Sequence, residues 1–222
     1  MNKAILHLSF LFCFISFSQD NWVSIDRHDL KFKLPNGYDF SETAKAKIYS
    51  FQDDEKIISL SIFKNDAVKN LKTDNLDGLK RYYKGVIDGY LDKSGSKLIS
   101  SETYKVQNNL AAKNLLKVVY QDGTLNLLET HVIYIDGLTY FATFQSVENP
   151  NQQIIDAKNS FFDSFIIDAS MGVTEENGSA TAISVGTYEL GETIGKVILY
   201  VLLALVVIIA LRFAFKNKKR TV

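Results

Sequence analysis

Apolar and polar residues alternate along much of the chain, which is the pattern of β-strands with one buried face. Residues 30–35 (LKFKLP) alternate in this way and run into the turn sequence Pro-Asn-Gly at 35–37. Residues 46–52 and 56–64 form two further runs on either side of an acidic segment at 53–55. We expect these two runs to form a β-hairpin.

Four longer runs, rich in β-branched, aromatic and other apolar residues, follow at residues 97–107, 111–121, 124–135 and 138–147. The last three are separated by Asp122-Gly123 and Asp136-Gly137. Asp-Gly between alternating runs is a strong signal for a tight hairpin. The three runs therefore predict an antiparallel meander.

Helical spacing occurs twice. Apolar residues recur every three or four positions between residues 76 and 90, which predicts an amphipathic helix. Gly85 and Gly89 weaken this helix, and we expect them to allow close packing on a sheet. A second helix is predicted after Asn149-Pro150, which supply an N-cap and a first-turn proline. Residues 165–167 are expected to add a short edge strand.

The order of hairpin, helix, meander and helix predicts the fold class. It indicates an α+β domain over residues 19–168, with an antiparallel sheet and two packed helices. Both ends of the chain lie outside this domain and have a different composition.

The N-terminal 18 residues predict a signal peptide. Lys3 precedes an apolar stretch, and small residues come just before Gln19, as at a signal peptidase site. Cys13 is the only cysteine and lies within this segment. The mature chain would therefore have no thiol for a disulfide or a thiolate metal site.

Residues 194–215 are a nearly uncharged apolar run, and as a helix they would span about 33 Å, close to the thickness of a bilayer core. They predict one transmembrane helix. Residues 169–193, rich in Gly, Ser, Thr and Glu, predict a flexible acidic linker. The basic tail, residues 216–222, predicts a cytoplasmic C-terminus through Lys216, Lys218, Lys219 and Arg220.

These features together predict a single-pass protein of the cell membrane. Its N-terminal domain would be extracytoplasmic, and periplasmic if the cell is Gram-negative. The lipid bilayer and a protein of the cell envelope are its expected partners. Residues 19–193 carry 18 basic and 25 acidic residues, a net charge of −7. This acidic balance argues against nucleic acid as a partner, because phosphate binding needs clustered Lys and Arg.

The chain resembles the PsbP-like fold family, including bacterial members of unassigned function. The resemblance covers roughly residues 22–168 and rests on three segments, which are LKFKLPNGYDF, YIDGLTYFATFQS and AKNSFFDSFII. It implies an αβα sandwich whose members mostly bind or stabilise partners rather than catalyse. The predicted C-terminal membrane span departs from the usual layout of that family.

Glu129 and His131 are the strongest candidates for chemistry, because residues two apart on a strand share one face. Such a pair could hold a metal with one more ligand, but a polar, half-exposed sheet face is the simpler interpretation. His28 and the acidic residues 53–55 are interpreted as solvated turns. The sequence contains no phosphate-binding glycine motif and no GxSxG or SxxK nucleophile motif. We therefore predict no catalytic, cofactor-binding or metal residues and no cofactor.

The sequence as a whole predicts a non-catalytic binding or assembly module with an unassigned ligand. An alternative is an envelope enzyme, a metal-assisted hydrolase that uses Glu129 and His131. Convergence of these two side chains with a third carboxylate or histidine in a pocket would favour that enzyme. Another alternative is a structural subunit of a membrane complex, which packing of Gly195 and Ala204 against a second helix would favour.

Overall fold

The computed structural model describes residues 22–27, 30–44, 46–64, 76–107, 109–120, 123–135, 137–167 and 187–200. Its labelled elements are β1 (Trp22–Arg27), β2 (Leu30–Pro35), β3 (Asp39–Glu42), β4 (Ala46–Gln52), β5 (Lys56–Lys64), α2 (Leu76–Ser94), β6 (Lys97–Val106), β7 (Asn109–Val119), β8 (Leu125–Ile135), β9 (Leu138–Val147), α3 (Gln152–Asp163) and β10 (Ile166–Ile167). Residues 187–200 form a further helix.

Two antiparallel sheets organise the fold. The larger has seven strands in the order β3-β4-β5-β9-β8-β7-β6, and the smaller has three in the order β1-β2-β10. Strands β6 to β9 follow one another as hairpins, and β9 returns to pair with β5. Helix α2 therefore carries the chain from β5 to the far edge of the large sheet, where β6 is the last strand.

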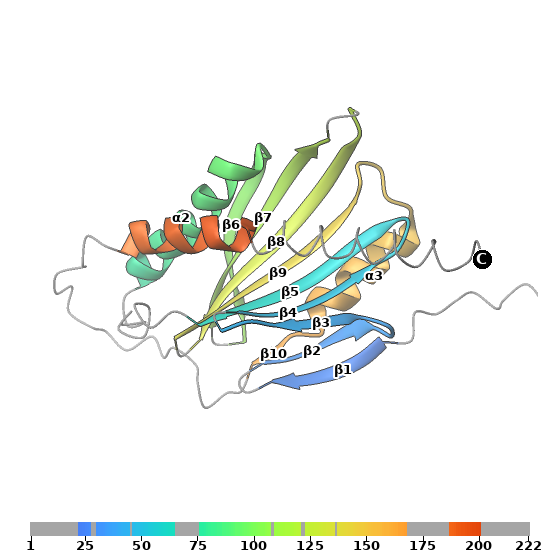
Figure 1. Cartoon of the computed structure of the whole chain (residues 1–222), viewed down its shortest axis with the longest axis horizontal. Helices are drawn as coiled ribbons and strands as arrows, with labels where there is room; N and C mark the ends of the chain where they lie inside the picture. The colour runs from blue at the N-terminus through green and yellow to red at the C-terminus, as the bar shows by residue number, and fades with distance from the viewer. Residues whose placement is uncertain are drawn as a thin grey trace, which may run out of the picture.

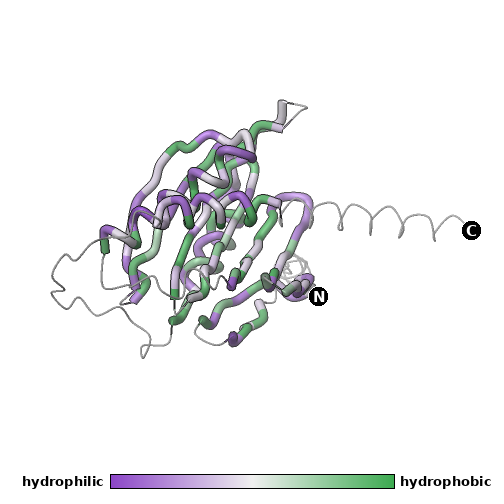
Figure 2. The backbone as a smooth tube through the Cα atoms, turned by 60° about the vertical axis from the view of Figure 1, so that its left-hand side comes forward, coloured by the Kyte–Doolittle hydropathy of each residue, from purple (hydrophilic) through white to green (hydrophobic). Residues whose placement is uncertain are grey.

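The large sheet lies between two layers (Figure 1). Helix α2 and residues 187–200 cover one face, and α3 with the small sheet covers the other. Each face has its own apolar core, because side chains alternate between the faces along every strand. Figure 2 shows hydrophobic residues (green) and hydrophilic residues (purple) following one another along the strands. In β2, for example, Leu30, Phe32 and Leu34 are buried while Lys31 and Lys33 are exposed.

Several local predictions match the structure. Strands β2, β4, β5 and β9 span the predicted residues, and Gly123 and Gly137 adopt the positive φ angles of 83° and 81° that their turns require. One capping prediction is wrong. Helix α3 is capped by Asn151 rather than Asn149, and the Asn151 side chain accepts a hydrogen bond from the Ile154 backbone N–H.

The predicted fold class needs correction. The prediction was an α+β domain with two packed helices, followed by a transmembrane helix. Strands account for 54% of the described residues and the helices are short, so the described part of the chain is mostly β-sheet, and no membrane-spanning helix is found in it. Strands β1 and β3 were not predicted and account for part of the difference.

Residues 187–200 pack directly on α2 through glycines. A Cβ atom added at Gly191 would lie 2.2 Å from the Tyr82 carbonyl oxygen, and one at Gly195 would lie 2.0 Å from the Val86 carbonyl oxygen. Only glycine permits backbones to approach this closely. From α2, Gly85 and Gly89 meet the backbone at residues 188–192. The prediction that these two glycines pack on a sheet is therefore wrong, because they pack on a helix.

The apolar side of this helix belongs to the core of the domain. Ile194, Ile198 and Leu199 are at most 5% exposed and join the cluster formed by α2 and the sheet. Polar contacts hold the same interface, because the Tyr188 hydroxyl donates to Asp88 Oδ2 at 2.7 Å. Residues 187–193, which were predicted to be linker, are therefore helical.

The predicted membrane-spanning helix is corrected by the same observations. Among the described residues, no helix is both long enough and apolar enough to cross a bilayer. An apolar run has the same hydropathy whether it packs on protein or in lipid, and Ile194, Ile198 and Leu199 of this run pack on protein. The predicted single-pass topology and cell-membrane localisation both depended on this membrane-spanning helix, so these two predictions are wrong as well.

The remaining terminal predictions lie outside the described residues. They are the signal peptide at 1–18, most of the linker, residues 201–215, and the basic tail with Lys216, Lys218, Lys219 and Arg220.

Candidate functional site

Strand β8 places Glu129 and His131 side by side on the face of the large sheet that α3 covers. The strand period predicted their shared face correctly. Their side chains are nevertheless buried, with exposed fractions of 6% for Glu129 and 5% for His131. The interpretation as a half-exposed polar face is therefore wrong, because α3 packs over this part of the sheet.

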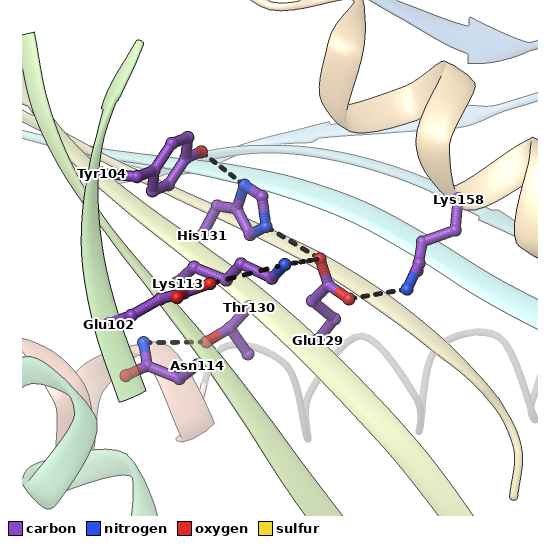
Figure 3. Close-up of polar contacts among 8 residues, drawn as sticks. All are labelled: Glu102, Tyr104, Lys113, Asn114, Glu129, Thr130, His131 and Lys158. Carbon is purple, nitrogen blue, oxygen red and sulfur yellow. Dashed lines mark hydrogen bonds and ion pairs between the residues drawn. The ribbon is translucent and has the colours of Figure 1, made fainter. Parts of the chain in front are cut away.

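A chain of hydrogen bonds through His131 and Glu129 links two strands and one helix (Figure 3). Tyr104 on β6 contacts His131 Nδ1 through its hydroxyl at 2.6 Å. On the other side of the ring, Nε2 lies 3.0 Å from Glu129 Oε1, and Lys158 Nζ of α3 lies 2.8 Å from Glu129 Oε2. The cluster thus ties β6 and β8 to α3.

One protonation state satisfies every contact of the imidazole ring. A neutral His131 with its proton on Nε2 donates to Glu129 and accepts from the Tyr104 hydroxyl at Nδ1. Burial raises the pKa of Tyr104, which keeps its hydroxyl protonated as the donor. Phe162 stacks on the ring with a centroid distance of 3.6 Å and an interplanar angle of 12°. These contacts fix the orientation of the ring.

Glu129 is ionised at neutral pH although it is buried. Burial alone would raise its pKa, but hydrogen bonds from His131 and Lys158 outweigh burial and hold the pKa at about 2. A second ammonium, Lys113 Nζ, lies 3.7 Å from Glu129 Oε1 and 3.6 Å from Glu102 Oε1. The buried carboxylate is therefore fully occupied by partners of this chain.

The groove beside this cluster is small. It has a volume of about 40 Å³. Ligand pockets usually enclose about 300 to 1,000 Å³, so this space suits a few water molecules rather than a substrate. Its lining is mostly apolar and includes Leu115, Leu127, Phe144, Ile154 and Ile155.

A metal site is not formed by these residues. Within the described part of the chain, no three His, Cys, Asp or Glu side chains come together in a way that could hold an ion. Tyr104 and two lysines, rather than a third carboxylate or histidine, complete the surroundings of Glu129 and His131. The ammonium groups of Lys113 and Lys158 would repel a cation at this place.

Other polar residues have structural roles or lie outside the described residues. Asp53 closes the β4–β5 hairpin, because its side chain accepts hydrogen bonds from the backbone N–H groups of Glu55 and Lys56. Tyr82 and Tyr83 are buried and anchor α2 to the sheet, with Tyr83 donating to the Leu110 carbonyl oxygen at 2.7 Å. His28 lies outside the described residues.

Sequence reasoning missed Tyr104 and Lys158. A signal for Lys158 was present, because this lysine falls within the apolar spacing of the second predicted helix. No comparable signal marks Tyr104, which reaches His131 only through the register of β6 and β7 against β8.

Comparison with solved structures finds distant similarity. The solution structure of cyanobacterial PsbP (CyanoP) from Synechocystis sp. PCC 6803 is 14% identical, covers 68% of this chain and 95% of its own, and has a TM-score of 0.45. The similarity is to the PsbP-like fold. It agrees with the resemblance predicted from the sequence and, at this identity, concerns the fold alone.

Two other structures are similar at a TM-score of 0.37 and 11% identity. A Pseudomonas aeruginosa protein of unknown function, PA94, covers 57% of this chain and 83% of its own. A protein from Bacteroides thetaiotaomicron VPI-5482 covers 62% of this chain and 44% of its own. No protein-family model matches the chain, and no curated protein matches it.

The buried histidine makes a prediction for pH dependence. Burial lowers the pKa of His131, and the nearby Lys113 and Lys158 lower it further, while Glu129 opposes this shift. Below the unfolded pKa of about 6.5, the unfolded chain binds a proton that folded His131 does not bind. Stability is therefore expected to fall by about 1 kcal/mol between pH 7.5 and 5.5.

Urea denaturation of the full chain at the two pH values measures this loss. The His131→Gln variant is expected to lose less stability over the same interval, whatever its stability at pH 7.5. The carboxylate of Glu129 does not obscure the result, because its depressed pKa confines its contribution to lower pH. An equal loss in both chains would show that His131 does not titrate as described.

Proposed function

We propose that this chain is a non-catalytic assembly module that joins a protein partner by strand addition at β6. The observation that carries the proposal is the exposed outer edge of β6. The Glu129–His131 cluster supports the absence of catalysis, because its buried polar groups contact one another and the groove that Glu129 and Lys158 line is too small for a substrate.

Strand β6 is ten residues long and is the last strand of the large sheet. Among the described strands it pairs with β7 only, so its other edge faces away from the sheet. The first seven side chains, residues 97–103, are all exposed. A long exposed edge of this kind offers a row of backbone groups to an incoming strand.

Apolar side chains on β6 mark where a partner would gain most from burial. Leu98 and Ile99 are adjacent and have exposed fractions of 43% and 52%. The opposite edge of the sheet differs, because β3 has only four residues. A partner therefore finds a longer ladder of backbone groups at β6.

Strand β6 also has features that disfavour pairing of an edge strand with non-specific partners. It carries lysines at 97 and 105, and its register against β7 shifts between Leu98 and Ser100. Lysines and bulges on edge strands disfavour mismatched strands. We infer that β6 accepts only a partner whose charges fit this pattern.

A lysine at position 99 is expected to reduce assembly. The Ile99→Lys variant places a charge where the partner would bury an apolar side chain, and association should weaken about tenfold or more. Ile166→Lys is a matched control, since Ile166 is also 52% exposed but lies on β10 of the small sheet.

The measurement is the sedimentation of the full-length chain in extracts of cells that express each variant. Wild-type and Ile166→Lys chains should sediment as an assembly and Ile99→Lys as a monomer. A monomeric wild type, or equal assembly of all three chains, would contradict the proposed function.

A further inference from the structure

We infer that the partner at β6 is a second copy of this chain, paired antiparallel through residues 97–102. The inference rests on the proposed function, because it names the partner of the same edge. It is carried by the charges of β6 and by the irregularity in its register.

The irregularity places two opposite charges on one face. Lys97 pairs with Lys117 of β7, and Glu102 pairs with Lys113. Positions 113 and 117 lie four residues apart on a regular stretch of β7 and therefore share a face, which is the face covered by α3. Lys97 and Glu102 thus lie on one face although they are five residues apart. In a regular strand, residues five apart would lie on opposite faces.

This arrangement is self-complementary under a two-fold axis between Ile99 and Ser100. Residues directly opposite in an antiparallel pair lie on the same face, and the axis sets Lys97 of each copy opposite Glu102 of the other. Leu98 then lies opposite Ser101, and both belong to the other face. Residues 97, 98, 101 and 102 therefore each lie opposite a residue on the same face, and both charge pairs are attractive.

Another symmetric register lacks this advantage. A two-fold axis at Glu102 would set the two Glu102 carboxylates opposite each other, which is unfavourable. The charges therefore favour the register centred between residues 99 and 100 over the one centred at Glu102, and the exposed Leu98 and Ile99 of both copies then gather around the axis.

Glu102 is available for such a contact. Its side chain is 65% exposed, and its ion pair with Lys113 has a distance of 3.6 Å, which is a weak surface interaction. Lys113 also keeps Glu129 as a second carboxylate neighbour at 3.7 Å. A second copy that brings Lys97 to Glu102 would therefore leave the buried cluster intact.

The test uses full-length chains with two different affinity tags, expressed together, and measures how much of one tag is recovered with the other. Lys97→Glu alone and Glu102→Lys alone each convert two attractive pairs into two repulsive ones. Recovery should fall about tenfold for each variant alone. The double variant K97E/E102K should recover at the wild-type level.

Mixing the two single variants gives the most discriminating result. One copy then has carboxylates at 97 and 102 and the other has ammonium groups at both positions, so both pairs between them are attractive again. We expect the mixture to restore recovery. Absence of wild-type recovery, unchanged recovery in the single variants, or failure of the mixture to restore it would each overturn the second-copy partner. Sedimentation of Ile99→Lys against Ile166→Lys decides separately whether β6 binds a partner at all.

Discussion

The Gly191→Val variant is expected to lose at least about 3 kcal/mol of unfolding free energy. A Cβ atom at this position would lie 2.2 Å from the Tyr82 carbonyl oxygen, which belongs to the backbone of α2 and cannot move away cheaply. The helix at 187–200 must therefore separate from α2. Ile194, Ile198 and Leu199, which are now buried, would then be exposed to water.

Thr193→Val is the matched control for this substitution. It places the same side chain two residues further along the same helix, at an exposed position. Urea denaturation of both full-length variants, followed by circular dichroism, gives the two free energies of unfolding. Thr193→Val should remain within about 0.5 kcal/mol of wild type. Equal losses in the two variants would show that the glycine contact does not hold the helix.

The Glu129→Gln variant is expected to lose about 3 kcal/mol of unfolding free energy at pH 7. The pKa of Glu129 is lowered from 4.5 to about 2 by its partners, and this difference is the free energy with which the fold favours the carboxylate. Glutamine keeps the shape of the side chain and removes the charge that Lys158 and Lys113 share. Breaking a buried charge cluster in this way leaves ammonium groups without their counter-charge.

Glu102→Gln provides the comparison. This carboxylate also contacts Lys113, but its side chain is 65% exposed and solvent screens the interaction. The unfolding free energy of Glu102→Gln should therefore fall by less than about 0.5 kcal/mol. Chemical denaturation at pH 7 measures both substitutions in the Ile99→Lys background, in which the β6 edge is expected to be unpaired. Equal effects at positions 129 and 102 would refute the role of burial in the cluster.

The local elements of the fold follow from short-range patterns. Alternation defines the strand at 30–35, and Asp-Gly pairs define the turns at Gly123 and Gly137, because these signals need no knowledge of distant residues. Short-range patterns could not predict the burial of Glu129 and His131. It depends on Tyr104 and Lys158, which lie 27 and 29 residues away from their partners in the chain.

The C-terminal helix shows where composition misleads. Residues 187–193 contain glycine and glutamate and were interpreted as linker, and the apolar residues that follow were interpreted as a membrane span. Both interpretations ignored the spacing of the glycines. Gly85 and Gly89 are four apart, as are Gly191 and Gly195, and this matched spacing lets the two helices dock backbone to backbone.

The helix at residues 187–200 covers a face of the large sheet, whereas the outer edge of β6 is uncovered among the described residues. Residues 187–200 complete the apolar core on the α2 face, so that face is closed by the chain itself. Strand β6 has no equivalent cover among the described residues, and its outer edge remains available. Assembly is therefore proposed at the edge of the sheet rather than on either of its faces.

Site-specific photo-crosslinking tests the assembly at β6 most directly. A photoreactive amino acid is placed at position 99 of the full-length chain, or at position 166 as the equally exposed control. The account predicts that irradiation joins position 99 to residues 97–102 of another copy, identified by mass spectrometry, and that position 166 gives no such product. Absence of any intermolecular product at position 99, or products at position 166 alone, would contradict the account.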